Sequence, residues 1–237
     1  MADTLYRRPI GGRVAVVIAT ERADGDVHPE RVARRTLAER QERVAPSRWV
    51  MVDQVHGTTV HQVTGDTPRW PLADAGDIIV ASSPGVPIAI WAADCAPIVL
   101  FGERGTMVAI HAGWRGLAAG VVDVALAQFV ERNELPLIAV LGPVVHPCCY
   151  EFGRGDLRAV ADGVHTDLDQ ISGRTSDGAV ALDVPAAVRA ALRHSGPELA
   201  AVGPCTGCGG RWFSHRRRGD LGRHALVAWV EPSIGVR

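Results

Sequence analysis

Three short segments place metal-capable side chains at the ends of apolar runs. His56 follows the run at 49–52, Cys95 follows the run at 88–91, and His111 closes the run that begins at 107. Two imidazoles and one thiolate suit Zn²⁺, and three protein ligands leave a fourth position for water, as in catalytic zinc sites. Zinc lowers the pKa of such a water to about 7. A single histidine or cysteine at a strand end is usually a packed residue, so the zinc hypothesis depends on all three together.

Charged neighbours of these residues indicate what the site would do. Asp94 precedes the thiol and would orient a ligand or accept a proton, and Arg115 would meet an anionic group at the start of the helix after His111. Backbone N–H groups and the helix dipole favour anions at such a position. Without a metal, Cys95 and His111 would instead be the nucleophile and base of a Cys–His hydrolase. The residues leave both interpretations open.

The elements that must position these residues do not alternate regularly. Short apolar runs bounded by glycine, proline or aspartate predict strands at 14–19, 49–52, 78–80, 88–91, 98–101, 107–111, 137–141, 199–202 and 226–230. Helical periodicity covers 29–44, 116–132 and 184–194, and loops are expected at 65–71 and 171–178. Because several strands follow one another, we expect a layered α/β sandwich with mixed sheets rather than a doubly wound sheet or a barrel.

Length and composition narrow the class of protein. The 237 residues, 47% hydrophobic and 22% charged, predict a single globular domain over 1–237. A net charge of -1 argues against a nucleic-acid or membrane partner. No apolar run reaches the length of about 20 residues that crosses a bilayer, and no signal peptide is recognisable. The five cysteines are not spaced like a disulfide framework, so we expect a cytoplasmic protein. We also expect a monomer rather than an oligomer.

The remaining cysteines and histidines receive simpler interpretations. Cys148 and Cys149 are adjacent, and Cys205 and Cys208 lack a second CxxC pair, so all four are expected to be ordinary reduced thiols. The basic run at 215–218 either binds phosphate or is a solvated face. Surface or helix-capping roles are expected for His28, His61, His165 and His194, and no role is assigned to His146 and His224.

Several motifs together resemble one family. They are QVHG at 54–57, ADCAP at 93–97, HAGWRG at 111–116, LGP at 141–143, PCCYE at 147–151, CT at 205–206, FSHRR at 213–217 and GR at 222–223. In this order they are similar to the laccase-domain, or multicopper polyphenol oxidase, family, whose members are now usually described as purine nucleoside phosphorylases. The resemblance runs from about residue 49 to the C-terminus.

The resemblance implies a fold, a metal and an activity. It implies a layered α/β fold shared with bacterial toxin deamidases that are cysteine hydrolases, and a zinc ion held by His56, Cys95 and His111. It implies phosphorolysis of adenosine, inosine and methylthioadenosine, together with adenosine deamination. Asp94, Cys95, His111 and Arg115 would then be catalytic, and Gln54, Arg115, Arg216 and Arg217 would bind substrate or phosphate. Copper is the less favoured metal, because multicopper dioxygen chemistry needs a larger histidine set.

The N-terminal region departs from the family pattern. Members usually carry a longer region with a Gly-Gly-Val-Ser element and an Asn-Leu-Gly stretch, of which only a remnant stands at 20–26. If that region closes the nucleoside pocket, this chain is expected to differ in substrate preference or activity. A Cys–His amidase, such as an enzyme that edits cell-wall precursors, and a weakly active metal-binding protein are therefore kept as alternatives.

Overall fold

Two β-sheets stacked face to face form the centre of the protein. The computed structural model describes residues 2–64, 74–193 and 196–231. One sheet has the strand order β1-β2-β12-β5, and the other has the order β11-β8-β6-β7-β4-β3. The strands of the first sheet are β1 (Asp3–Ile10), β2 (Arg13–Ala19), β12 (His224–Glu231) and β5 (Ile88–Ala92). Those of the second are β11 (Glu198–Val202), β8 (Pro136–Leu141), β6 (Ala96–Gly102), β7 (Met107–Ala112), β4 (Ile78–Ala81) and β3 (Val60–Val63).

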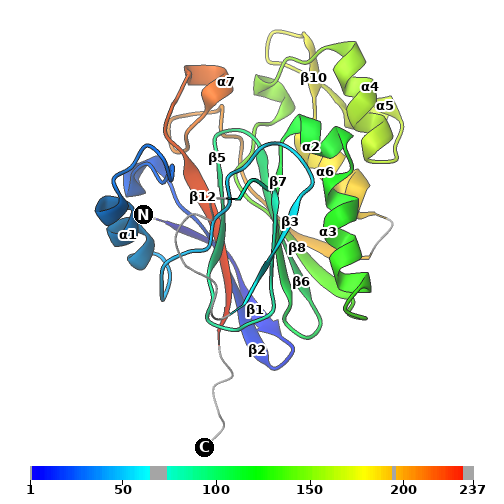
Figure 1. The fold of residues 1–237 in the computed structure, drawn as a ribbon. Coiled ribbons are helices and arrows are strands. Elements are labelled where there is room, and N and C mark those ends of the chain that lie inside the picture. The colour runs from blue at the N-terminus through cyan, green and yellow to red at the C-terminus, as the bar shows by residue number, and fades with distance from the viewer. Residues whose placement is uncertain (1, 65–73, 194–195, 232–237) are drawn as a thin grey trace, which may run out of the picture.

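Helices cover the outer faces of both sheets (Figure 1). Most of them lie over the six-stranded sheet: α2 (Trp114–Ala118), α3 (Val121–Val130), α4 (Arg154–Gly163), α5 (Leu168–Ile171) and α6 (Val184–Leu192). The helix α1 (Arg34–Glu42) lies outside the four-stranded sheet, and the short α7 (His215–Arg218) stands beside the upper end of β12. A 3₁₀ turn η1 (Arg22–Asp24) follows β2, η2 (Pro147–Cys149) follows β8, and a hairpin of β9 (Ser172–Arg174) and β10 (Val180–Leu182) packs beside η2.

The pairing confirms mixed sheets. The pairs β3–β4 and β8–β11 are parallel, and the other pairs within the two large sheets are antiparallel. The single-domain α/β fold with mixed sheets that the sequence predicts is therefore correct.

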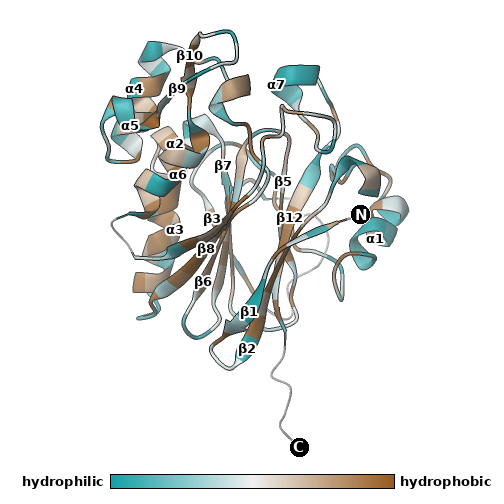
Figure 2. Ribbon diagram, turned by 180° about the vertical axis from the view of Figure 1, so that it is seen from behind, coloured by the Kyte–Doolittle hydropathy of each residue, from teal (hydrophilic) through white to brown (hydrophobic). Residues whose placement is uncertain are grey.

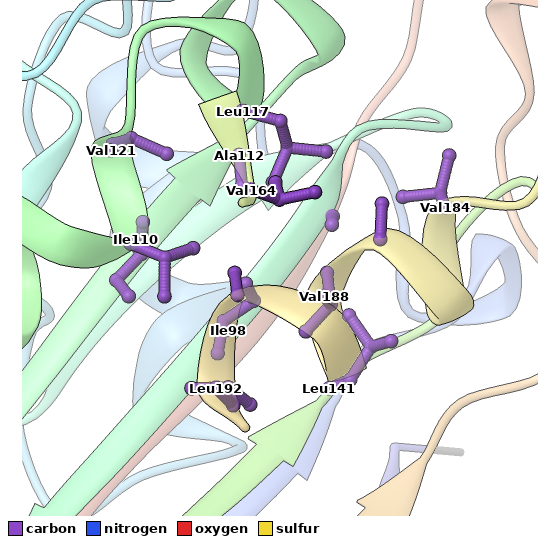
Figure 3. Close-up of a cluster of buried hydrophobic side chains, with 14 of the residues drawn as sticks. Ile98, Ile110, Ala112, Leu117, Val121, Leu141, Val164, Val184, Val188 and Leu192 are labelled. Carbon is purple, nitrogen blue, oxygen red and sulfur yellow. The ribbon is translucent and has the colours of Figure 1, made fainter. Parts of the chain in front are cut away.

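The core consists of three apolar layers, and successive side chains of a central strand point alternately into two of them. On β6, Ile98 and Leu100 face the helices, whereas Val99 and Phe101 face the other sheet. Because both faces are buried, the strand reads as a continuous apolar run rather than as an alternating one. Figure 3 shows the helix-side layer, where α2, α3 and α6 pack on the sheet. Figure 2 shows the same pattern as hydrophobic strands in the centre and hydrophilic surface on α1, α4 and α7.

Three predicted elements differ from the structure. The run at 49–52 is buried but pairs only through a bridge between Val50 and Ile88, so its apolar character reflects burial and not a strand. The helix expected at 29–44 begins only at Arg34, because Val32 donates to the His28 carbonyl in a separate turn and Ala33 has an extended ψ of 138°. The helix expected at 116–132 is two helices, because Gly120 has φ 75° and caps α3.

The structure also describes one of the two predicted loops and a histidine that was expected on the surface. The predicted loop at 171–178 contains β9 and the turn that leads to β10, closed by Gly178 with φ 90°. The predicted loop at 65–71 and His194 lie outside the described residues. His28 is not a surface residue: it is 9% exposed, and its ring lies 4.8 Å from the Trp91 ring. Among the described residues, no helix combines the length and the hydropathy needed to cross a membrane.

Candidate metal centre and active site

Strand register brings the three predicted metal ligands to one end of the six-stranded sheet. Pro97 at the start of β6 pairs with His111 near the end of β7, so Cys95, just before β6, lies beside that histidine. On the other side of β7, the His111 N–H donates to the carbonyl of Asp77, which directly precedes β4. His56 lies in the loop before β3, whose first residue pairs with the first residue of β4. The three ligands, far apart in the sequence, therefore converge.

The distances among the three side chains suit a metal ion. One ligand atom each of His56, Cys95 and His111 lies within 4.8 Å of the other two. The Cys95 Sγ is 3.7 Å from His56 Nε2. Tetrahedral zinc with Zn–S of about 2.3 Å and Zn–N of about 2.05 Å places its sulfur and nitrogen about 3.6 Å apart. His111 is buried, Cys95 is half-buried and His56 is exposed, so the site faces solvent on the His56 side.

Asp77 holds two of these ligands in place. Its Oδ1 lies 2.7 Å from His111 Nδ1 and accepts the backbone N–H of His56, and its Oδ2 accepts the N–H of Gly57. Burial would raise the pKa of Asp77, but these hydrogen bonds hold it below its ordinary value. An ionised Asp77 keeps the proton of His111 on Nδ1 and leaves Nε2 for a metal, which is how carboxylates orient metal-binding histidines.

The electrostatics make Cys95 a thiolate near neutral pH. Burial alone would raise the pKa of its thiol, but the His111 and His56 rings lower it to about 6. Burial would likewise lower the pKa of His111, whereas Cys95 and Asp77 raise it to about 9. A thiolate is the form that binds metal and also the form that acts as a nucleophile.

The backbone at the site is strained and tightly packed. His56 has φ 62° and Asp94 has φ 103°, values that residues other than glycine rarely adopt and that often occur at functional sites. Gly113 leaves room for the ligands, since a Cβ there would lie 2.5 Å from His56 Cδ2 and 3.2 Å from Cys95 Sγ.

Asp94 and Gln54 lie beside the site with their polar atoms in use. The carboxylate of Asp94 accepts the Thr206 hydroxyl at 2.6 Å and the Arg216 backbone N–H at 2.6 Å. The Gln54 amide donates to the Trp91 carbonyl at 2.7 Å and accepts the Trp91 N–H at 3.1 Å. In this structure, Asp94 therefore joins the thiol loop to α7, and Gln54 joins the His56 loop to β5.

The predicted cationic residues lie around Tyr150. Arg216 stacks 5.0 Å over the Tyr150 ring and donates to the Glu151 carbonyl, and Arg115 stacks 4.4 Å over Trp114. Burial raises the pKa of Tyr150 to about 12, with Cys95 adding to the increase while Arg216 and Arg115 oppose it. The Trp114 and Tyr150 rings both contact the Phe152 ring, so the two arginines stack on one aromatic cluster, and the Arg216 N–H joins this cluster to Asp94, next to Cys95. Arg217 is exposed on α7, where its N–H donates to Ser214 Oγ.

Sequence reasoning did not identify Asp77, Tyr150 or Thr206. Asp77 is a fully buried carboxylate immediately before an apolar run, and that position was a recognisable signal. The four cysteines expected to be ordinary reduced thiols are free in the structure, but Cys148, Cys149, Cys205 and Cys208 gather within 4.8 Å of one another, which sequence reasoning did not predict. Sequence separation concealed this cluster, which forms only when the η2 turn meets the loop before α7.

Comparisons with known proteins show the family to which the chain belongs. A family model described as multi-copper polyphenol oxidoreductase laccase matches residues 19–231. A purine nucleoside phosphorylase of Streptomyces coelicolor is 36% identical over 219 residues, which are 88% of this chain and 86% of that protein. The purine nucleoside phosphorylase YfiH of Escherichia coli is 34% identical, over 78% of this chain and 75% of its own.

A solved structure shows the same fold. The crystal structure of a Neisseria meningitidis protein matches with a TM-score of 0.78 at 24% identity, covering 98% of this chain and 99% of that one. The family model covers nearly all of the chain, including every segment that forms the site. The chain therefore belongs to the multi-copper polyphenol oxidoreductase laccase family, several members of which are named purine nucleoside phosphorylases.

Proposed function

We propose that the protein is a zinc-dependent purine nucleoside phosphorylase, with the zinc held by His56, Cys95 and His111. The observation that carries the proposal is the convergence of these three ligand atoms within 4.8 Å at a solvent-facing sheet end. Relatives that are 36% and 35% identical to this chain over the aligned residues are named purine nucleoside phosphorylases. Zinc suits a site of two imidazoles and one thiolate, and copper is the less favoured metal.

The residues around the metal have distinct roles in the proposal. The bound ion would act as a Lewis acid and lower the pKa of a water at its open position. Arg216, which stacks over Tyr150, and Arg115, which stacks over Trp114, would bind phosphate or another anion, and the exposed Arg217 is also available. Asp94 and Gln54 would act by positioning the loops that carry Cys95 and His56, because their polar atoms are hydrogen-bonded to neighbouring segments.

The proposed substrates are adenosine, inosine and methylthioadenosine. In phosphorolysis, an oxygen of hydrogen phosphate bonds to C1′ of the ribose as the C1′–N bond breaks, and the proton lost by the phosphate passes to the departing purine. The guanidinium groups would hold the phosphate, and the base would leave as a neutral molecule. Adenosine deamination is proposed as a side activity, in which water replaces the exocyclic amine. We also propose that the protein acts as a monomer in the cytoplasm, where reduced thiols persist.

The test is product analysis with and without phosphate. Inosine plus phosphate should give hypoxanthine and ribose 1-phosphate in equal amounts, and omission of phosphate should abolish both products. An Arg216→Gln variant should raise the KM for phosphate more than the KM for inosine, whereas Arg13→Gln, on β2 away from the site, should change neither. Absence of free base at high enzyme concentration would contradict the proposal.

A second candidate is a metal-free Cys–His hydrolase or amidase, comparable to the toxin deamidases. The observation that favours it is the charged pair itself, since the Cys95 pKa falls to about 6 while that of His111 rises to about 9. In this function, Cys95 would attack an amide carbonyl and His111 would protonate the leaving amine. A thioester trapped on Cys95 by an amide substrate would favour this candidate, and metal-dependent formation of free purine would exclude it as the main activity.

A further inference from the structure

Four cysteines outside the candidate active site meet in one cluster. Cys148 and Cys149 come from the η2 turn, and Cys205 and Cys208 come from the loop between β11 and α7. Their sulfur atoms all lie within 4.8 Å of one another. The Cys148 sulfur is 3.8 Å from that of Cys149, 3.7 Å from that of Cys205 and 3.6 Å from that of Cys208, and the sulfurs of Cys149 and Cys208 are 3.7 Å apart.

These separations correspond to a tetrathiolate metal site. A disulfide bond places its two sulfurs about 2.05 Å apart. A zinc ion with four Zn–S bonds of about 2.3 Å places each pair of sulfurs about 3.8 Å apart, the edge of a regular tetrahedron. We propose that Cys148, Cys149, Cys205 and Cys208 together bind a second metal ion, a structural Zn²⁺ that is separate from the His56, Cys95 and His111 site.

The backbone around the cluster is shaped to bring the four sulfurs together. The His146 N–H donates to the Cys205 sulfur at 3.4 Å, the kind of contact that stabilises a thiolate. Gly207, between the two loop cysteines, has no side chain, and a Cβ there would lie 2.6 Å from Cys149 Cβ and 2.8 Å from its sulfur. Gly209 turns the chain with φ 70°, a value that suits glycine.

One arginine holds the same loop from outside. The Arg218 guanidinium donates to the carbonyl groups of Thr206, Gly207 and Gly209. The stretch 203–214 contains no strand or helix: its β-pairing is limited to a bridge at Cys205, and a few further backbone hydrogen bonds join it to the segments around Leu141 and Arg22. A segment with so little regular structure gains most from a metal, because the binding free energy becomes folding free energy.

Four protein ligands define the role of this ion. A closed set of four thiolates leaves no position for substrate or water, which is the pattern of structural zinc. The ion would join two segments that border the candidate active site. The η2 turn leads into Tyr150, and Thr206, next to a ligand, donates its hydroxyl to Asp94. The cluster therefore positions groups near Cys95 without taking part in the chemistry.

The test uses metal analysis in variants that separate the two sites. The Cys95→Ala protein, purified without chelator, should retain about one zinc per chain, and Cys95→Ala with Cys208→Ser should retain none. Cobalt introduced into the Cys95→Ala protein should give the absorption of a tetrahedral tetrathiolate. If the active-site proposal alone is wrong, wild type and Cys95→Ala will hold the same single zinc. If the four-cysteine proposal is wrong, Cys95→Ala will hold none, so the two failures are distinguishable.

A second pair of variants tests the four-cysteine site without removing any of its four thiols. In the Cys95→Ala background, Gly207→Ala should weaken zinc binding roughly 10- to 100-fold, as expected when groups around metal ligands are displaced. Gly210→Ala is the matched control, because a Cβ there meets no atom within 4 Å. A Cys95→Ala protein that is folded by circular dichroism but carries no metal, or carries disulfides among the four cysteines, would overturn the proposal. Iron at full occupancy would overturn the assignment of zinc.

Discussion

At the residue scale, the candidate site depends on groups other than the three proposed metal ligands. Asp77 contacts His111, His56 and Gly57 at once, so a single buried carboxylate fixes two ligands from different segments. Gly113 contributes by the absence of a side chain. Both roles lead to predictions that separate positioning from ligation.

Replacing Asp77→Asn should lower zinc affinity roughly 10- to 100-fold, because the amide nitrogen cannot accept the hydrogen bonds that orient the ligands. The affinity is measured by competition with a chromophoric chelator. Asp123→Asn is the matched control, since Asp123 also pairs with a histidine, His165 at 2.8 Å, but on the surface. Equal affinity in the Asp77→Asn and wild-type proteins would show that His111 needs no carboxylate partner.

Gly113→Ala should displace the His56 ring and reduce both zinc affinity and phosphorolysis by at least about tenfold, an effect of the size seen for groups that orient metal ligands. The cause is steric, because Gly113 has φ -70°, which alanine adopts freely. Gly155→Ala is the control, since a Cβ there has no neighbour within 4 Å. Metal binding is measured by calorimetry, and an unperturbed Gly113→Ala protein would refute the close packing of His56 on this glycine.

At the element scale, β12 carries a buried histidine without hydrogen-bond partners. His224 is 0% exposed, and neither ring nitrogen has a partner among the described residues. Burial, with Arg223 and Arg22 assisting and the Pro143 backbone opposing, lowers the pKa of His224 from 6.5 to about 3. The unfolded chain therefore binds one more proton than the folded chain between these values. This histidine reduces stability progressively as the pH falls below about 6.5.

His224→Phe should flatten the dependence of unfolding free energy on pH by about 1.4 kcal/mol per pH unit between about pH 6 and 4. The measurement is urea unfolding at several pH values. His215→Gln, on the exposed surface of α7, should leave the wild-type slope unchanged. A variant at His224 that keeps the full acid sensitivity would show that other groups cause it.

The junction of α2 and α3 also gives a test. Gly120 has φ 75°, where an L-residue costs roughly 1–2 kcal/mol, so Gly120→Ala should lower the free energy of unfolding by that amount. Gly155→Ala, inside α4 and free of contacts, should lower it by less or raise it. Equal effects of the two substitutions would contradict the break at Gly120.

The elements that the sequence predicted share one property. The strands β2, β4, β5, β6, β7, β8, β11 and β12 are apolar runs with clear boundaries, and such runs are what hydrophobic patterning detects. Most of them are largely buried, and β11 is the partly exposed exception. The strands β1 and β3 were missed because they are partly exposed and polar. The helix α4 was also missed, although its buried residues Leu157, Val160 and Ala161 recur at helical spacing. The helix α7 was missed because it is a single basic turn. Exposed elements carry a weaker pattern, so sequence reasoning loses them first.

At the scale of the whole molecule, the site forms where two sheets and several loops meet. Cys95 lies on the connection from β5 in one sheet to β6 in the other, so the loop that carries the thiol joins the two sheets (Figure 1). His56, Cys95 and His111 could be predicted from the sequence, because their residue types suit a metal and they lie in motifs that resemble the family's. It did not show Asp77 or the four-cysteine cluster, because these depend on tertiary contacts between distant segments.

The N-terminal region contributes to the same assembly. Arg22 stacks 4.5 Å over Phe213, and Arg211 pairs with Glu21 at 2.7 Å, so the segment after β2 packs on the segment that leads to α7. The idea that a shortened N-terminal region alters substrate preference stays a prediction. Kinetic comparison of adenosine, inosine and methylthioadenosine would test it.

The central claim is that Cys95 is a metal ligand, and the reactivity of its thiol tests this most directly. Wild-type protein loaded with zinc is treated with an alkylating reagent, and each cysteine is quantified by mass spectrometry. A zinc-bound thiolate should react slowly, whereas the His56→Ala variant, which lacks one ligand, should release the Cys95 thiol and label faster at neutral pH, because His111 still lowers the pKa of that thiol. The other four cysteines should be unaffected by His56→Ala. Rapid labelling of Cys95 in the zinc-loaded wild type would contradict the account.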